Sequence, residues 1–486
     1  MLTEIANEDF PAFLRRPALR SPVVRRPSFW PRVREFAVPP SMIETATARR
    51  LSGDWAGACA AAGFDVDLNL RTAAHTWGSE LASLVRDDLR HLAPDLLRWH
   101  LPRIAPDGLL RPGLTIALAR YESVGTRTGH PVQLVVRTPP AWADAGQRVS
   151  LALWDGASGP AGAPGPPGPP SSRYPHPHPD RRFRFDLHRH LWDARRSDEL
   201  RARSGAELPD VSDEFGAGSA AAVLPEEVPD GYPCAVDRWE AEAATVLRAE
   251  GRTSGLVTVR LSKRHRLLLE LPEGGGRLRV SVLSADNKSA ELPVLPDPAT
   301  WVLPDLELLR TGAIEADRLH PLVAAALAPD APGVAAGTVR ARQRPGEPRT
   351  VDCRGSLHRI GLVDGVLVPF DHDPAELRRE ELLVALNGPP LPCLRAIDEA
   401  HRSPECLTGV SERLAHGDIA GALAVVEGLL GPQAVLRDGA LRDELETVAR
   451  RKVAYGLFRA ELSVPVPGVP RRGKIDWFVP VHGGRP

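Results

Sequence analysis

The sequence predicts an α+β protein, with N-terminal helices and a mostly antiparallel sheet, a second β-rich region and a C-terminal bundle of short helices. Apolar residues recur at helical spacing over 42–99, alternate with polar residues in segments between 114 and 284, and return to helical spacing over 374–461. Because one hydrophobic core stops growing at roughly 250–300 residues, a chain of 486 residues also predicts more than one packed unit.

Residues 1–40 predict an extended, basic, proline-rich arm. Prolines recur in FLRRPALRSPVVRRPSFWPRVREF, and each disfavours a helix at the residue before it. Residues 41–203 predict an α+β region. Two helices meet at Gly53, the second capped by Asp54, and a longer helix covers about 72–99. The alternating segments LTIALARY, VQLVVRT and RVSLALW then predict strands.

A proline- and glycine-rich stretch interrupts this region at 155–181. Glycine occupies every third position of GPAGAPGPPGPP, which is typical of polyproline II structure or disorder. Since the alternation resumes in RFRFDL (182–187), we interpret 155–181 as a loop that joins two strands of one sheet. The polar, proline-marked segment 204–234 is the predicted linker between domains.

Residues 235–370 predict a β-rich region that begins with a helix near 236–250. Strands are predicted in GLVTVRL, HRLLLEL and RLRVSVL and again near 338–354. Asp364-Gly365 lies between two apolar runs, which is a strong signal for a two-residue hairpin.

Residues 371–462 predict a helical bundle, followed by a tail at 463–486. Asp373 is a predicted N-cap, with a proline and a capping-box glutamate after it. Gly417-Asp418 predicts the end of one helix and the cap of the next. The helices are expected at about 374–387, 391–402, 404–415, 419–430 and 440–461.

Composition restricts the classes of function. The formal net charge of −1 argues against a surface that binds nucleic acid or anionic lipid throughout. Arginine greatly outnumbers lysine, and we interpret this as the codon bias of a high-GC bacterium. The chain also lacks the P-loop, HExxH, GxSxG, Rossmann and EF-hand motifs. The commonest nucleotide-binding, zincin and α/β-hydrolase functions are therefore not indicated.

A soluble, cytoplasmic protein is the expectation for localisation. The five cysteines are odd in number and dispersed, with no CxxC pair, which does not suggest a disulfide framework. The N-terminal residues lack the apolar run of a signal peptide, and no stretch of 18 apolar residues predicts a membrane span. No membrane partner is expected.

The basic arm is a candidate nucleic-acid contact, because guanidinium groups bind phosphates and aromatic rings stack on bases. The alternative is an arm that packs its aromatic residues on the body and leaves its arginines in water, which we favour. The candidate binding residues are Arg15, Arg16, Arg25, Arg26 and Trp30.

Two groups of histidine and aspartate are candidate metal ligands. His188 and His190 form an HxH pair, which in an extended segment projects both imidazoles to one side; a solvated strand end is the alternative. Asp371 and His372 follow the predicted hairpin, with His358 on the opposing strand. These three are the candidate catalytic residues, since a divalent metal there would activate water for hydrolysis.

A third group contains cysteine and histidine within the predicted bundle. Its spacing matches no common zinc pattern, so we interpret its cysteines as small buried side chains. The members are Cys393, His401, Cys406 and His416.

The sequence does not determine a function. It favours a non-catalytic intracellular interaction or scaffold protein of a high-GC bacterium, whose partner is another protein. One alternative is a metal-dependent hydrolase that acts on a phosphoester. A second is a nucleic-acid-associated protein that uses the basic arm. No cofactor is strongly implied, although a divalent metal fits the second histidine group.

Overall fold

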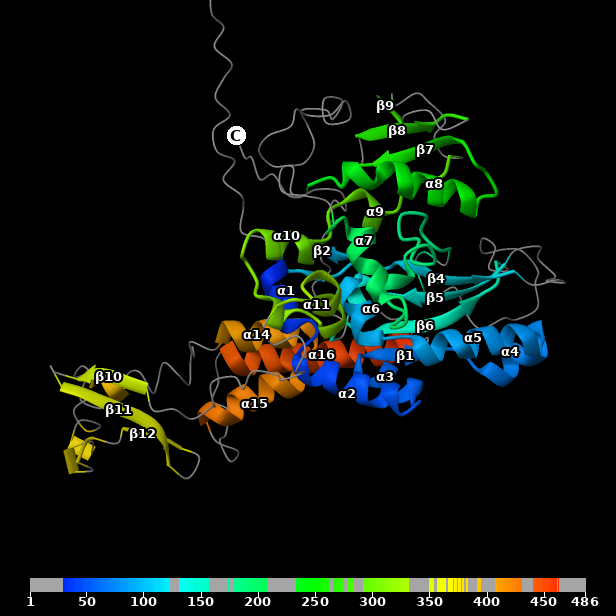
Figure 1. The fold of residues 1–486 in the computed structure, drawn as a ribbon. Helices are drawn as coiled ribbons and strands as arrows, with labels where there is room; N and C mark the ends of the chain where they lie inside the picture. Colours follow the sequence, from blue (N-terminus) through cyan, green and yellow to red (C-terminus); the bar gives the residue numbers. More distant parts are fainter. Residues whose placement is uncertain are drawn as a thin grey trace, which may run out of the picture.

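The structure is a computed structural model, and it confirms the α+β class (Figure 1). Residues outside the following set are not described. The described residues are 29–122, 131–144, 146–156, 174, 176, 178–207, 233–262, 265–273, 278–283, 292–331, 349–353, 356–363, 366–369, 371–373, 375, 376, 378, 379, 382, 391–394, 407–430, 440–460 and 462.

The first helices differ from the predicted ones in two places. The expectation of an extended arm is wrong for Trp30–Phe36, which forms helix α1, because a proline in the first turn needs no hydrogen-bond donor. The single helix predicted over 72–99 is three helices, broken at Gly78, which has a φ of +93°, and again before Pro94. The other helices here are α2 (Pro40–Leu51), α3 (Trp55–Ala61), α4 (Leu70–Trp77), α5 (Ser79–His91) and α6 (Pro94–His100).

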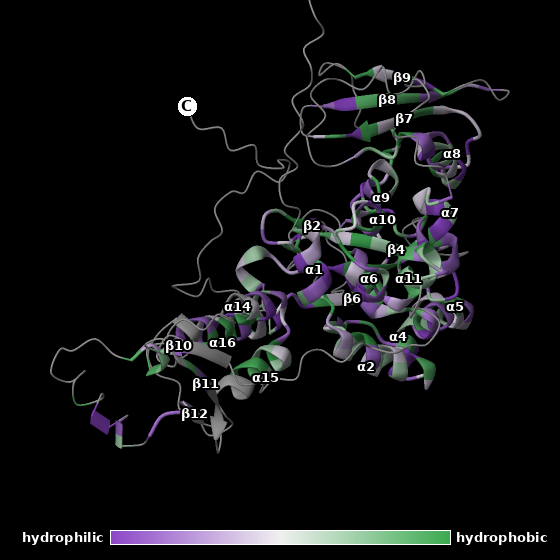
Figure 2. Ribbon diagram, turned by 60° about the vertical axis from the view of Figure 1, so that its left-hand side comes forward, coloured by the Kyte–Doolittle hydropathy of each residue, from purple (hydrophilic) through white to green (hydrophobic). Residues whose placement is uncertain are grey.

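These helices pack on a four-stranded sheet of order β1-β6-β5-β4, which is antiparallel except where β1 joins β6. Its core includes Leu89, Leu97, Ile116 and Leu134, and hydrophobic residues run along β4 (Figure 2). The strands are β1 (Phe64–Val66), β4 (Thr115–Tyr121), β5 (Val132–Arg137) and β6 (Val149–Trp154), with a small hairpin of β2 (Arg103–Ile104) and β3 (Leu109–Leu110) beside them.

The strand predicted at 182–187 is not a strand. Arg184 makes only an isolated bridge to Ala117, and the alternation arises because Phe183 and Phe185 insert into the main core from a series of turns. Most of the loop 155–181 and of the linker 204–234 lies outside the described residues. A short helix, α7 (Leu200–Ser204), precedes the linker.

A second sheet, of order β7-β8-β9, contains the three strands that the sequence predicted, and all of its pairings are antiparallel. Alternate residues such as Val257, Val259, Leu267 and Leu269 are buried against Trp239 of the helix α8. This unit forms the upper layer of Figure 1. Its elements are α8 (Trp239–Ala249), β7 (Gly255–Arg260), β8 (Arg266–Leu271) and β9 (Arg279–Val282).

The predicted β-rich region 235–370 also contains three short helices, which is a correction. Leu308, Ile314 and Val323 from this segment join the main core of the N-terminal sheet and not the core of β7–β9. After the sheet β7–β9, the chain therefore returns to the unit that contains the N-terminal sheet. The helices are α9 (Asp297–Thr300), α10 (Pro304–Arg310) and α11 (Pro321–Leu327).

A third sheet contains β10 (Arg349–Cys353), β11 (Ser356–Val363) and β12 (Val366–Pro369). Val363 pairs with Val366, so two residues connect the antiparallel strands β11 and β12, as the Asp364-Gly365 signal predicted. This sheet stands to one side of the other elements, beyond α15 (Figure 1).

The C-terminal helices are α14 (Leu407–His416), α15 (Ile419–Leu430) and α16 (Ala440–Arg459). The predicted break is confirmed, because Gly417 has a φ of +90° and the Asp418 carboxylate accepts a hydrogen bond from the Gly421 amide at 2.9 Å. Helices α14–α16 also pack on the N-terminal region. Arg459 of α16 pairs with both carboxylate oxygens of Asp67 at 2.5 and 2.6 Å.

Arg98 of α6 joins the C-terminal helices to this region. Its guanidinium is buried and donates to the carbonyls of Ala37, Ala62, Gln147 and His416 at 3.1, 3.4, 2.7 and 3.1 Å. Ala37, Ala62 and His416 lie at the C-terminal ends of α1, α3 and α14. A cation is favourable at that end of a helix, where carbonyls lack partners.

Gly417→Ala is expected to lower the free energy of unfolding by about 2–3 kcal/mol. The added methyl group would meet the backbone carbonyl of Gly146, and φ at this position lies in the region that favours glycine. Gly456→Ala is the matched control, because its methyl group meets nothing within 4 Å. Denaturant unfolding measures both; equal stability of the two variants would contradict the tight contact at Gly417.

Among the described residues, no helix has the length and apolar character needed to cross a membrane.

Candidate metal centre

Two cysteines and one histidine converge beside the third sheet. The sulfur atoms of Cys353 and Cys393 and an imidazole nitrogen of His372 all lie within 4.8 Å of one another. A tetrahedral zinc ion, with Zn–S bonds of about 2.3 Å, holds its ligands within about 4 Å of each other. Small side-chain rotations would therefore bring all three atoms onto one ion.

The fold brings these residues together from three separate segments. Cys353 is the last residue of β10, His372 follows the end of β12, and Cys393 lies in a helical turn at 391–394. The hairpin β11–β12 returns the chain so that His372 reaches the end of β10. Asp373 then accepts a hydrogen bond from the Ala375 amide at 3.0 Å, consistent with its predicted cap.

The surroundings of the cluster resemble those of metal ligands. His372 Nδ1 lies 3.4 Å from the Glu376 carboxylate, and its Nε2 is buried without a hydrogen-bond partner among the described residues. Ligand histidines in metal sites commonly use one nitrogen for the metal and the other for a carboxylate. The Cys393 amide also donates to the Cys353 sulfur at 3.1 Å.

Burial, and then contact with Cys353, raises the pKa of the Cys393 thiol to about 11. A thiol of this kind keeps its proton at neutral pH unless a cation displaces it. The donor set contains soft sulfur and imidazole nitrogen, which are the ligands that zinc prefers. The cluster fits zinc better than magnesium or calcium, which take oxygen ligands.

His358 and Asp371, the other two members of the predicted group, have different positions. The ring of His358 lies against that of His372, with 4.0 Å between the ring centroids. Asp371 instead pairs with Arg359: its oxygens accept from the Arg359 amide at 2.8 Å and from the guanidinium at 3.0 Å. These bonds lower the pKa of Asp371 to about 2.

Asp371→Asn is expected to leave the metal content of the purified chain unchanged, because the carboxylate pairs with Arg359 outside the sulfur cluster. Cys353→Ser should abolish metal binding. Elemental analysis of both variants beside the wild type tests this. Loss of the metal from Asp371→Asn would show that the carboxylate is a ligand.

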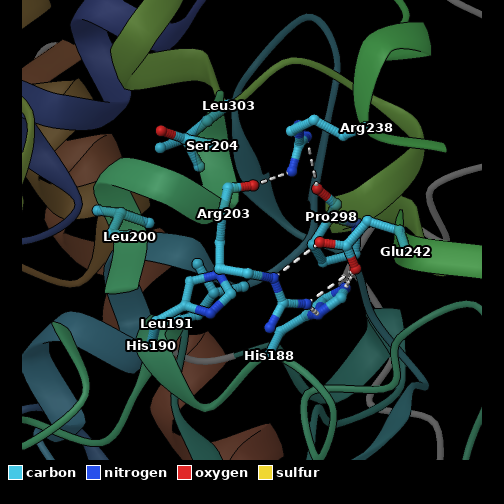
Figure 3. A pocket seen from close by; sticks show the side chains of 10 residues that line it. All are labelled: His188, His190, Leu191, Leu200, Arg203, Ser204, Arg238, Glu242, Pro298 and Leu303. Carbon is cyan, nitrogen blue, oxygen red and sulfur yellow. Dashed lines mark hydrogen bonds and ion pairs between the residues drawn. The ribbon is translucent and has the colours of Figure 1, made fainter. Parts of the chain in front are cut away.

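The other predicted histidine pair, His188 and His190, lines a small pocket (Figure 3). Both rings are buried, with 5.7 Å between their centroids. Arg203 donates to both oxygens of Glu242 at 2.8 Å, and Arg238 donates to the Pro298 carbonyl at 3.4 Å. The pair is therefore an interior feature and not a solvated strand end.

This pocket is a poor cation site. Burial, and then the positive charge of Arg203, lowers the pKa of His188 well below its usual value. Burial likewise lowers the pKa of His190. The nearest carboxylate, Glu242, is already paired with Arg203. A volume of about 20 Å³ accommodates about one water molecule, so the pocket is too small for a substrate.

The remaining members of the third predicted group are separated from the cluster or outside the described residues. His401 and Cys406 are not described. His416 is buried at the end of α14, with its Nε2 3.7 Å from the Glu412 carboxylate. Burial, and then the charges of Arg103, Arg98 and Arg32, lowers the pKa of His416 to about 3.

His416 predicts a loss of stability in acid. Because its pKa in the folded chain lies below the value of about 6.5 in an unfolded chain, the unfolded chain binds more protons as the pH falls below 6.5. His416 therefore lowers the free energy of unfolding by about 1.4 kcal/mol for each pH unit below about 6.5, down to about pH 3. Between pH 7.5 and 5.5, the free energy of unfolding should fall by less in His416→Gln than in the wild type, as denaturant unfolding measures. An equal fall in both proteins would contradict a buried neutral His416.

The candidate binding residues of the arm are only partly described. Arg15, Arg16, Arg25 and Arg26 lie outside the described residues. Trp30 begins α1, where its ring packs against Phe29 with 4.9 Å between the centroids and against the Arg34 guanidinium at 4.9 Å. This packing agrees with an aromatic residue that covers the body.

Sequence reasoning missed Cys353 and separated His372 from Cys393. A signal was present: Cys353 and His358 have C-x4-H spacing in the sequence. Comparisons of the chain with protein-family models, with curated proteins and with solved structures found no match. What the chain does is therefore inferred from its own residues.

Proposed function

We propose that this chain is a non-catalytic interaction protein in which a zinc ion holds the segment 349–394 in a defined shape. The convergence of two buried thiols and the His372 imidazole, whose side chain is 4% exposed, to within 4.8 Å of one another carries this proposal. Zinc sites with two or more cysteine ligands are commonly structural, and they supply folding energy to small units that lack a large core. Another protein is the proposed partner.

The two alternatives have less support. A phosphoesterase would use a carboxylate beside the metal to orient the attacking water, and Asp371, the carboxylate predicted at this site, is paired with Arg359. A nucleic-acid function would use arm residues that are not described, and Trp30 is already packed on the body.

We also infer a cytoplasmic location in a high-GC bacterium. Cys59, Cys234, Cys353 and Cys393 are unpaired thiols among the described residues. Unpaired thiols and a zinc-thiolate centre suit a reducing compartment. The arginine-rich, lysine-poor composition supports a high-GC bacterium as the source.

The test compares the wild type with Cys353→Ser, both as full chains. Immobilised wild type should retain a specific partner from a lysate of the native cell, and Cys353→Ser should retain less of it. Neither protein should hydrolyse a generic phosphoester, with or without added zinc. Zinc-dependent turnover by the wild type that Cys353→Ser lacks would overturn the non-catalytic proposal in favour of the hydrolase.

A further inference from the structure

The register of the third sheet places a further donor, His358, on the sheet face that carries Cys353, although His358 lies outside the group of atoms within 4.8 Å of one another. Val351 pairs with His358, and Cys353 pairs with Ser356. Residues that pair directly, or that lie two apart on one strand, have side chains on the same face of a sheet. Cys353 and His358 therefore share one face, as diagonal neighbours. Leu357, between these positions, lies on the other face and is 73% exposed.

The contacts of His358 agree with this placement. Its ring lies 4.0 Å from that of His372 between centroids, at an interplanar angle of 48°. His358 Nδ1 is buried and has no hydrogen-bond partner among the residues described. The Nε2 atom of His372 is likewise buried and has no hydrogen-bond partner among the described residues. A buried nitrogen without a partner costs free energy that a bound metal ion would remove.

We propose that His358 is the fourth ligand, so that Cys353, His358, His372 and Cys393 bind one zinc ion in a closed tetrahedral site. This inference rests on the proposed function and decides whether the zinc ion is structural or catalytic. Two thiolates and two neutral imidazoles balance the charge of Zn²⁺. With four protein ligands, no position remains for a water molecule to be activated, and the ion is structural.

The closed site also explains how a short segment holds its shape. Units of this size generally need a metal or a disulfide to fold, because they bury too little apolar surface. The four ligands come from β10, β11, the residue pair after β12 and the turn 391–394. One ion would therefore tie the strands β10 and β11 to the residues 371–372 and 391–394.

Zinc affinity of the full chain, measured by competition with a chromophoric chelator, tests the inference. His358→Ala should weaken zinc binding by about a hundredfold or more, since even partners of ligands contribute ten- to hundredfold. Leu357→Ala is the matched control on the opposite face of the same strand, and its affinity should equal that of the wild type. Equal affinities of His358→Ala and Leu357→Ala would overturn the inference.

A second variant covers the case in which His358→Ala does not fold. His358→Cys should retain zinc, because three cysteines and one histidine form a common structural site. X-ray absorption should then show three sulfur ligands, against two in the wild type. Two sulfur ligands in both proteins would mean that His358 lies outside the site, while the proposed zinc centre would stand. A wild type that binds no zinc would instead overturn the centre itself.

Discussion

Cys393→Ser is expected to lose zinc and, with it, the structure of segment 349–394. Metal binding in small structural sites supplies an apparent free energy of about 10–16 kcal/mol near neutral pH, most of which is coupled to folding. The backbone amides of β11 should therefore exchange with solvent as fast as those of an unfolded chain. Those of β4 and β5 should stay protected, since their core contains neither cysteine.

Hydrogen exchange detected by mass spectrometry measures this in the full chain. Cys234→Ser is the control, because Cys234 is a free cysteine that packs on the core of the second sheet. It should keep both zinc and the protection of β11. Full protection of β11 in Cys393→Ser, or in wild type stripped by a chelator, would contradict a structural role for the ion.

Arg98→Met is expected to destabilise the chain by about 3 kcal/mol or more, with α14 most affected. Burial lowers the pKa of Arg98 to about 10, so removing the charge recovers roughly 3 kcal/mol of burial cost. Four hydrogen bonds from a charged donor, each contributing about 1.5–3 kcal/mol, outweigh that recovery. The loss also leaves buried carbonyls at Ala37, Ala62 and His416 without this donor.

Arg86→Met provides the matched control, because Arg86 is exposed on α5. Denaturant unfolding compares the two variants, and limited proteolysis reports release of α14 from the N-terminal region. An Arg98→Met protein as stable as Arg86→Met would show that the guanidinium adds nothing to the junction.

Local signals predicted the elements whose conformation depends on local chemistry. The alternation of period two predicted β4 to β9, and the Asp-Gly pair predicted the hairpin β11–β12. The glycine and aspartate of Gly417-Asp418 predicted a helix break, because one can adopt a positive φ and the other can cap. These features need no knowledge of distant residues.

Features that depend on tertiary contacts were not predictable in this way. Phe183 and Phe185 alternate like strand residues, yet they lie in turns because the main core receives their rings. Helices α10 and α11 return to a core formed almost two hundred residues earlier, which no local pattern indicates. The metal cluster joins Cys353 to Cys393 across a hairpin, so motif spacing alone could not group them.

The most direct test of the zinc centre is the mass of the intact full chain under native conditions, after purification without added metal. The wild type should carry one zinc ion and should have lost two protons, one from each thiol of Cys353 and Cys393. Cys353→Ser and Cys393→Ser should show the metal-free mass. A metal-free wild type after incubation with zinc, or equal zinc in all three proteins, would contradict the zinc centre.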